Sequence, residues 1–81
     1  MDKNRLRWAC RRGMLELDLL LAPFAEEVYE TLEESDQLRF EALLECEDQS
    51  LFLWLMKRQP ADNPDLQRIV QIIHESRSKV G

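Results

Sequence analysis

Sharp backbone turns are scarce in this sequence. Glycine occurs only at Gly13 and at the terminal Gly81, and proline occurs three times in 81 residues. These are residues that tight turns between strands require, so a β-meander would lack most of its turns. A chain of this length forms one small domain with a thin hydrophobic core. We therefore predict an all-α fold, a small compact bundle of four to five short helices, in a single domain spanning residues 1–81.

Apolar residues recur at helical spacing in five stretches of the chain. The expected helices cover residues 3–11, 14–32, 36–46, 49–57 and 64–78. The longest stripe comprises Met14, Leu17, Leu21, Phe24, Val28 and Leu32. A proline inside a helix removes a backbone hydrogen bond and clashes with the preceding turn, so Pro23 predicts a kink or a short break in this second segment.

Capping residues set the expected ends of these helices. The predicted N-caps are Asp2 or Asn4, Ser35, Asp48 and Asn63. Pro64 is expected at the first position of the last helix, and Gly13 is expected to end the first helix as its C′ residue. The run Leu51–Met56 is apolar on all sides, and its pattern alone would also allow a strand. We favour a helix there, because the chain offers no second strand to pair with it.

Charge is unevenly distributed along the chain. Residues 1–13 carry a net charge of +4, residues 14–48 carry −11 and residues 49–81 carry +2, for a total of −5. The acidic flank would repel nucleic acid, whereas a protein with a matching charge pattern would be attracted. The longest apolar run, residues 19–25, is too short to span a bilayer. The basic N-terminus has no apolar segment behind it to form a secretory signal, so we expect a cytoplasmic protein without membrane insertion.

Reactive groups are few. The one histidine, His74, has no second ligand at a metal-binding spacing and no carboxylate four residues away. Cys10 and Cys46 form no CxxC pair, and we expect two free thiols in a reducing compartment rather than a disulfide. No glycine-rich loop is present to hold a phosphate. The sequence therefore predicts no catalytic, metal-binding or cofactor-binding residue, and a protein that is not an enzyme.

Residues 11–18 join the basic segment to the acidic one. The lone interior glycine there indicates either a positive φ angle or a close approach by another surface. On one interpretation, Arg12 and Glu16 form a local i, i+4 ion pair on a solvated corner. On the other, the corner is a docking patch. Gly13 would then admit a partner's backbone, the arginines would bind a carboxylate bidentately, and Trp8 would be the aromatic anchor. A core position for Trp8 is an equal alternative.

The stretch Arg12-Gly13-Met14-Leu15-Glu16 has the form RGxxE. In this motif the sequence resembles the SdhE family, also called YgfY, the bacterial relatives of the mitochondrial succinate dehydrogenase flavinylation factor. The agreement extends over nearly the whole chain. It includes Arg5, Trp8, Cys10-Arg11, Leu17-Asp18, Pro23-Phe24, residues 43–46, Asp48, the run from Leu51 to Met56, and Pro60-Ala61.

The resemblance implies a helical assembly factor. Such a factor promotes covalent attachment of FAD to the flavoprotein subunit of succinate dehydrogenase, and also of fumarate reductase, by binding that subunit without being the catalyst. FAD is then the group attached to the partner, and we expect this chain to be a monomer that binds no cofactor stably. The partner-binding residues are Arg12, Gly13 and Glu16, with Arg5, Trp8, Arg11 and Asp18 as neighbours. The alternative function is an antitoxin-like or regulatory protein-binding module, a label that some family members carry.

Overall fold

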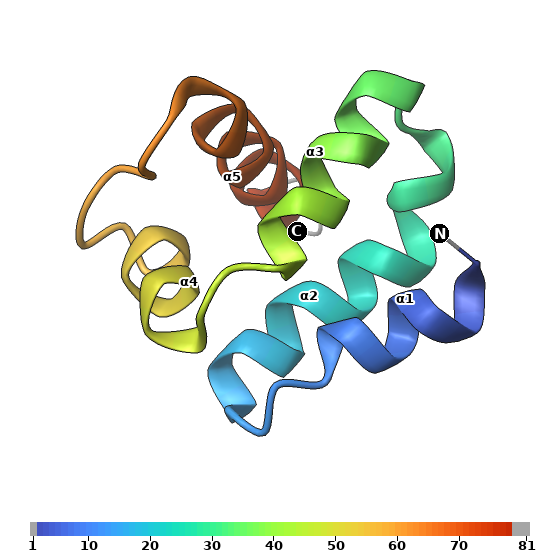
Figure 1. The fold of residues 1–81 in the computed structure, drawn as a ribbon, viewed down its shortest axis with the longest axis horizontal. Helices are drawn as coiled ribbons and strands as arrows, with labels where there is room; N and C mark the ends of the chain where they lie inside the picture. Colours follow the sequence, from blue (N-terminus) through green and yellow to red (C-terminus); the bar gives the residue numbers. More distant parts are fainter. Residues whose placement is uncertain (1, 79–81) are drawn as a thin grey trace.

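Helices make up the regular secondary structure of this protein. The structure, a computed structural model, describes residues 2–78. Its elements are α1 (Lys3–Cys10), α2 (Leu15–Glu27), the 3₁₀ turn η1 (Tyr29–Thr31), α3 (Glu34–Leu44), α4 (Asp48–Leu55) and α5 (Pro64–Ser78), shown in Figure 1. No strand occurs among the residues described. The predicted all-α fold is therefore confirmed, with a helix over most of the ambiguous apolar run.

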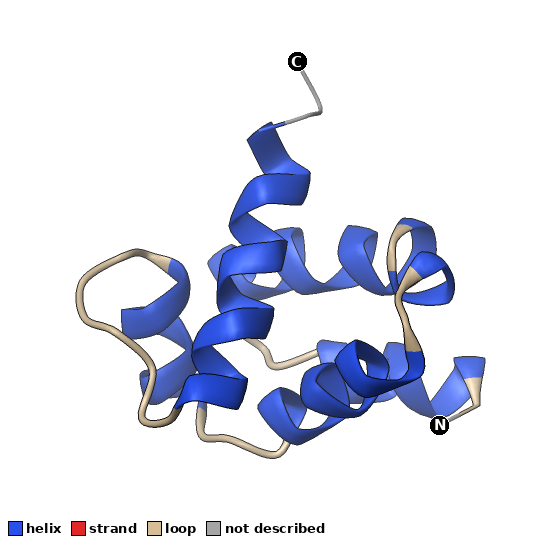
Figure 2. Cartoon of the chain, turned by 90° about the horizontal axis from the view of Figure 1, so that it is seen from above, coloured by secondary structure: helices blue, strands red, loops and turns tan. Residues whose placement is uncertain are grey.

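The first two helices form a hairpin on which the others assemble. α1 and α2 run side by side along the lower edge of Figure 1, in blue and cyan, and a short turn joins them. α3 packs against α5, and α4 packs against both α2 and α5. α5 is seen nearly end-on in Figure 1 and lengthwise in Figure 2, so it crosses the hairpin instead of extending it.

A single cluster of apolar side chains lies between the helices. Its buried members are Leu6, Cys10, Leu17, Leu20, Leu21, Phe24, Ala25, Tyr29, Phe40, Leu43, Leu44, Leu51, Trp54, Leu55, Leu66, Ile69, Val70 and Ile73. The rings of Phe24 and Phe40 lie with their centroids 4.9 Å apart and join α2 to α3. The predicted stripe of the second segment is buried at Leu17, Leu21 and Phe24 and half-buried toward both of its ends. Its periodicity therefore identified the correct face of α2.

Pro23 does not interrupt α2. The helix continues through Pro23 to Glu27, and the chain then tightens into η1. A break at Pro23, one of the two predicted alternatives, does not occur, and the predicted helical continuation to residue 32 is wrong. Pro23 lies on the exposed face of α2, where water can bind the carbonyl oxygen of Leu19 that loses its helical partner. The helix therefore continues past the proline at this position.

Two of the predicted N-caps are confirmed. Oδ1 of Asp2 accepts a hydrogen bond from the backbone N–H of Arg5 at 3.0 Å, at the start of α1. Oδ1 of Asn63 accepts one from the backbone N–H of Leu66 at 2.9 Å, and α5 begins at the next residue, Pro64, as expected. Each bond satisfies a backbone donor that has no partner within its helix.

Helices α3 and α4 begin earlier than the sequence predicted, so Ser35 and Asp48 are not their N-caps. The N-cap residues are Glu33 and Glu47, and neither side chain makes a capping hydrogen bond. Asp48 is instead the first residue of α4, and its carboxylate is bound by Arg12 from the turn between α1 and α2. A tertiary ion pair has thus replaced the local capping bond that the sequence suggested.

Asp36 is the buried charged residue of the described core. Its carboxylate accepts hydrogen bonds from Arg39 at 2.9 Å and from Arg68 at 3.1 and 3.3 Å, which ties α3 to α5. Arg39 also donates to Asp65 at 2.9 Å. The bonds to Asp36, foremost those from Arg68, outweigh its desolvation and hold its pKa below the ordinary value of 3.8. A buried carboxylate therefore stays ionised between two helices.

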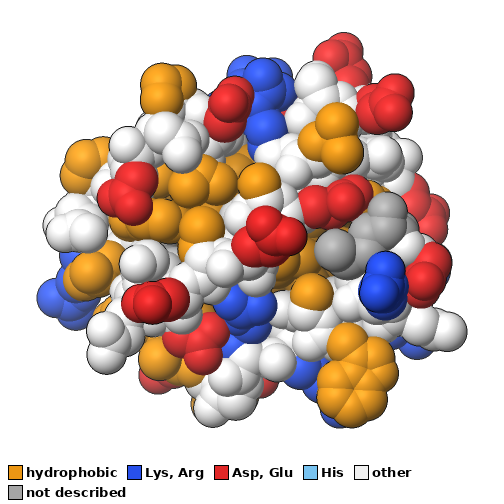
Figure 3. All heavy atoms as spheres, in the orientation of Figure 1, with side chains coloured by type: hydrophobic (Ala, Val, Ile, Leu, Met, Phe, Trp, Pro, Cys, Tyr) orange, Lys and Arg blue, Asp and Glu red, His pale blue; other side chains and the backbone are white. Residues whose placement is uncertain are grey.

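Acidic side chains are scattered over the face of the molecule seen in Figure 3, interspersed with apolar ones. Four large apolar residues are mostly exposed, namely Trp8, Leu15, Leu19 and Leu38. Within residues 2–78, no helix combines the length and the hydropathy that a membrane span requires. Three of the four exposed residues lie on the α1–α2 hairpin, which makes its surface the place to look for a binding site.

Candidate functional site: the α1–α2 corner

Arg12 lies just beyond α1, and its guanidinium group binds other parts of the chain. Nη1 donates to the carbonyl oxygens of Ala9 and Leu44, each at 2.8 Å, and Nη2 donates to the carbonyl oxygen of Cys46. Nε donates to Oδ1 of Asp48 at 2.8 Å. The three carbonyl groups lie at or just beyond the C-terminal ends of α1 and α3, where backbone oxygens lack helical partners. One side chain thereby joins α1, α3 and α4.

These contacts overturn two expectations for Arg12. Its ion pair is with Asp48, and none forms with Glu16 in the described structure. An i, i+4 pair requires one continuous helix, but α1 ends at Cys10 and α2 begins only at Leu15. The side chain is 14% exposed and already holds a carboxylate, so it is not presented for bidentate recognition of a partner. Arg12 is a positioning residue beneath the corner.

Gly13 and Asp18 shape the turn between α1 and α2. Gly13 has a φ of +78°, the left-handed region that favours glycine, so the positive-φ alternative is confirmed. Its assignment as the C′ residue of α1 is wrong, because the C-cap is Arg11 in an extended conformation. Oδ1 of the half-buried Asp18 accepts the backbone N–H of Arg12 at 2.8 Å. Asp18 therefore holds the turn from within.

The outer side of this turn is open. Apart from its two chain neighbours, no described residue would come within 4 Å of a Cβ atom at Gly13. The backbone angle, and not crowding within the chain, is therefore what requires glycine here. Glu16 is exposed in the first turn of α2, where the helix dipole favours a carboxylate. A second molecule could approach the backbone at Gly13 and meet a negative charge beside it.

Three large apolar side chains stand in solvent on the same hairpin. Trp8 is 77% exposed, Leu15 68% and Leu19 66%, so Trp8 is not a core residue. Leu15 and Leu19 are four residues apart on α2 and therefore adjacent on its surface. Neither leucine is among the site residues predicted from the sequence. Their signal was available, since both fall opposite the buried stripe through Leu17 and Leu21.

Two shallow hollows adjoin on the α1–α2 hairpin, one on α1 alone and one between α1 and α2. One is lined by Asn4, Arg7, Trp8 and Arg11, and the other by Arg7, Arg11, Ala22, Ala25 and Glu26. Because they share two arginines, the exposed surface is continuous from Trp8 across the groove to α2. Arg5 and Arg11 make no ion pair with any described residue. We define the corner surface as Arg5, Trp8, Arg11, Gly13, Leu15, Glu16 and Leu19.

The remaining groups with acid–base or ligand chemistry lie away from the corner surface or beneath it. Nε2 of His74 is 2.9 Å from the carbonyl oxygen of Leu55, and a carbonyl can only accept, so this nitrogen carries the donated proton. Cys10 and Cys46 are both free, as predicted. Burial raises the pKa of Cys10 to about 11, so this thiol is protonated at neutral pH. Among residues 2–78, no group of three or more potential ligands is placed to hold a metal ion.

Comparison with protein families matches residues 4–77 to Sdh5, described as the flavinator of succinate dehydrogenase. The chain belongs to this family. The resemblance inferred from the RGxxE stretch is therefore confirmed, and the Sdh5 match covers all of the corner surface.

Curated relatives agree with the Sdh5 assignment, and each of those compared is named FAD assembly factor SdhE. The relative from Pseudomonas putida is 57% identical over 72 residues, which cover 89% of this chain and 86% of the relative. The one from Pseudomonas aeruginosa is 56% identical with the same coverage. The one from Shewanella oneidensis is 51% identical over 70 residues, covering 86% of this chain and 85% of the relative.

A solved structure also resembles this member of the Sdh5 family. The solution structure of a protein described as UPF0350 is 48% identical in sequence and superposes with a TM-score of 0.75. The match covers 96% of this chain and 84% of the other. The helical arrangement described above is thus similar to one determined for a related chain.

Proposed function

We propose that this chain is an assembly factor that promotes covalent attachment of FAD to the flavoprotein subunit of succinate dehydrogenase by binding that subunit. The names of the family and of its curated relatives support this role. We extend the proposal to the flavoprotein subunit of fumarate reductase. We also propose that the chain acts as a monomer in the cytoplasm and binds no FAD stably itself.

The observation that carries the proposal is the open backbone at Gly13 within a rigid corner. No described residue beyond its chain neighbours lies within 4 Å of a Cβ position at Gly13, and Glu16 and Trp8 are exposed on the same hairpin. Beneath it, the guanidinium of Arg12 fixes the turn through bonds to α1, α3 and α4. A preorganised surface loses little conformational entropy on binding, and an exposed aromatic residue is a frequent source of binding energy.

Binding alone can accelerate the attachment without a reactive group from this chain. If the factor binds one arrangement of the flavoprotein more tightly than others, it raises the population of that arrangement. An arrangement that holds the flavoprotein's histidine against the flavin shortens the search for a reactive geometry. In this proposal the flavoprotein carries out the chemistry, and the corner surface supplies only differential binding energy.

In-gel flavin fluorescence of the purified apo-flavoprotein, incubated with FAD and with or without this chain, tests the proposal. We expect covalent flavin to form faster with the chain present. Glu16→Ala should remove most of that acceleration while leaving the far-ultraviolet circular dichroism unchanged. Glu27→Ala is a matched control, because this exposed glutamate lies on the same face of α2, roughly 16 Å along the helix.

Full acceleration by Glu16→Ala would contradict the corner assignment. Equal flavinylation with and without the wild-type chain would contradict the function. A pull-down that returns a small protein and no flavoprotein would favour the antitoxin-like or regulatory alternative.

A further inference from the structure

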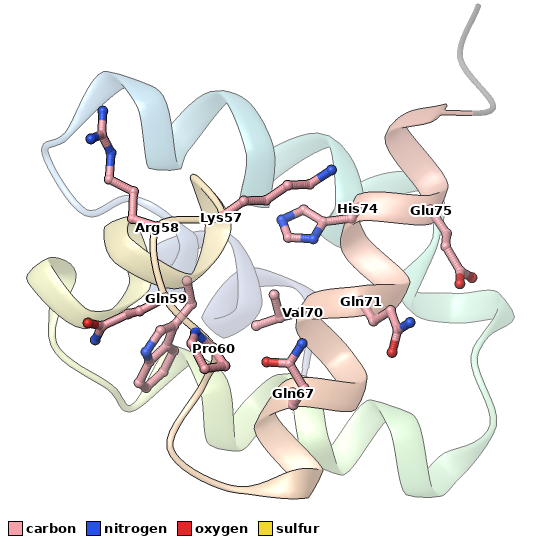
Figure 4. Close-up of a pocket in the computed structure, with 10 residues that line it drawn as sticks. Lys57, Arg58, Gln59, Pro60, Gln67, Val70, Gln71, His74 and Glu75 are labelled. Carbon is pink, nitrogen blue, oxygen red and sulfur yellow. The ribbon is translucent and has the colours of Figure 1, made fainter.

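A second surface feature lies at the other end of α4. A hollow of about 630 Å³ opens between the C-terminal turn of α4, the loop that follows it, and α5. We call it the α4–α5 hollow and define it by Trp54, Lys57, Arg58, Pro60, Gln67 and His74. Figure 4 shows Lys57 extending across one rim toward His74, whereas Gln67 and Pro60 form the opposite rim.

Lys57 holds an unusual backbone conformation at this rim. Its φ is +60°, and its N–H donates to the carbonyl of Trp54 at 3.2 Å while the N–H of Arg58 donates to the carbonyl of Leu53 at 2.8 Å. This pair of bonds is the Schellman motif, in which Lys57 occupies the C′ position that glycine ordinarily fills. A lysine here has an unfavourable backbone conformation that glycine would avoid. The fold therefore gives no reason for lysine at position 57, and its side chain is the part that a ligand could use.

Trp54 gives an independent sign of a missing hydrogen-bond partner. Its indole is 2% exposed and lines the hollow, and its Nε1–H donates to no group among residues 2–78. A buried donor without an acceptor is destabilising, so a partner that supplies an acceptor gains free energy there. Nε1 is covered by its neighbours, so an acceptor reaches it only when these neighbours shift.

The charge around the hollow indicates an acidic partner. Lys57, Arg58 and Arg77 make no ion pair with any described residue, whereas most cations elsewhere on the described surface do. Lys57 and His74 also line a second, adjoining hollow together with Arg77. The one carboxylate that lines the larger hollow, Glu75, points away from it in Figure 4. Three of the five described cations that pair with no described residue therefore lie around these two hollows, where they would attract an anion to a chain of net charge −5.

The shape favours a protein segment over a small molecule. The hollow is open on one side, whereas small-molecule sites enclose most of their ligand. Its position also suits a partner that already touches the corner surface. Arg12 holds the first residue of α4, Asp48, and the hollow begins at the last turn of the same helix. Eight helical residues span roughly 12 Å, so only the length of this short helix separates the residue that Arg12 binds from the hollow.

We propose that the α4–α5 hollow is a second docking site for the flavoprotein, which inserts a segment bearing an Asp or Glu carboxylate. The carboxylate pairs with Lys57, and an acceptor oxygen of the same segment receives the Trp54 indole N–H. This inference rests on the proposed function, because it takes the flavoprotein as the partner.

Calorimetric titration of the full chain with the apo-flavoprotein tests the site. Lys57→Gly should melt at the same temperature as the wild type or higher, because glycine suits the C′ position, yet bind roughly five- to tenfold more weakly. Lys57→Glu should weaken binding further. Lys3→Gln is the control for loss of an exposed cation, since Lys3 is paired with Glu30 far from the hollow, and its affinity should stay within about twofold of the wild type.

Fluorine NMR of chain labelled with 5-fluorotryptophan gives a second readout. The two tryptophan signals are assigned in the free chain with Trp8→Phe. Binding of the flavoprotein should shift the Trp54 signal of the wild type and leave it nearly unchanged in Lys57→Glu.

Three results would overturn the inference. Wild-type affinity in both Lys57 variants, with binding lost in Glu16→Ala, would refute the hollow and leave the proposed function intact. Absence of binding by the wild type would refute both. Self-association of the chain in sedimentation velocity that Lys57→Glu abolishes would make the hollow an interface between copies instead.

Discussion

Arg12 and Asp48 are 36 residues apart in the sequence, and Nε of the arginine lies 2.8 Å from Oδ1 of the aspartate. This contact joins the turn that carries Gly13 to the first residue of α4. Arg12 therefore connects the corner surface to the packed helices of the bundle. A change at Arg12 should lower both the stability of the fold and the affinity for the flavoprotein. Two residues of the RGxxE motif thus have different roles. Arg12 lies beneath the corner surface and holds it in place, whereas Glu16 is part of that surface.

Arg12→Lys should destabilise the protein although it keeps the charge. An ammonium group cannot reproduce the planar fork that reaches Ala9, Leu44, Cys46 and Asp48 together. We expect a loss of about 2 kcal/mol or more in the free energy of unfolding, measured by urea denaturation. Arg11→Lys is the control, since Arg11 is exposed, and it should stay within about 0.5 kcal/mol of the wild type. Equal stability of the two variants would contradict a stabilising role for the hydrogen bonds of Arg12.

Substitutions of Gly13 should show whether its positive φ angle or steric crowding requires glycine at this position. Gly13→Ala places a Cβ in open space but at a φ of +78°, so the expected cost is about 1 kcal/mol. Gly13→Asn should cost less, because asparagine tolerates the left-handed region better. Thermal unfolding of the two variants measures this difference. If both are as stable as the wild type, the positive φ is not what requires glycine.

The ion pairs of Asp36 should make stability depend on acid. Hydrogen bonds from Arg68 and Arg39 hold its pKa below 3.8 in the folded state, so its contribution is present above that value and is lost as pH falls through the folded pKa. Asp36→Asn should lower the melting temperature at neutral pH by roughly 5–10 °C. The difference in melting temperature between the variant and the wild type should become smaller below about pH 4. A gap that does not change with pH would show that packing, not charge, is what Asp36 contributes.

Tyr29 should ionise only at unusually high pH. Burial, followed by the 2.6 Å hydrogen bond from its hydroxyl to Glu41, raises its pKa from 10.0 to about 12. Because the folded pKa is raised, the stabilisation is present below pH 10 and is lost as pH rises through the folded value. The chain has one tyrosine, so tyrosinate absorbance reports this group alone. Glu41→Gln should lower the pH midpoint of the tyrosinate titration. An unchanged midpoint would show that the Glu41 carboxylate does not raise the pKa of Tyr29.

The two thiols should differ in their reaction with an aromatic disulfide reagent. Cys10 is fully buried and burial raises its pKa to about 11, whereas Cys46 is half-buried with a smaller elevation from the same cause. We expect Cys46 to react first and Cys10 only as fast as the protein opens. Cys46→Ser isolates the slow phase, which mild denaturant should accelerate. A fast reaction of Cys10 in native buffer would show that α1 opens readily.

Local rules located most of the fold. The caps at Asp2 and Asn63 and the apolar stripe of α2 depend on neighbours within a few residues, and both could be read without tertiary information. The same rules failed at Pro23, because the cost of a helical proline depends on which face of the helix meets water. They also failed at Ser35, because α3 begins one residue earlier, at Glu34.

The sequence by itself determined the helical class, the buried face of α2 and the glycine turn, because periodicity and the conformational freedom of glycine are local properties. Only the tertiary structure decided what Arg12 binds, since its partners Leu44, Cys46 and Asp48 lie 32 to 36 residues away. The same is true of the exposure of Trp8 and of the Trp54 indole, which finds no acceptor among residues 2–78. Each of these depends on which elements pack together, and no spacing along one helix encodes that.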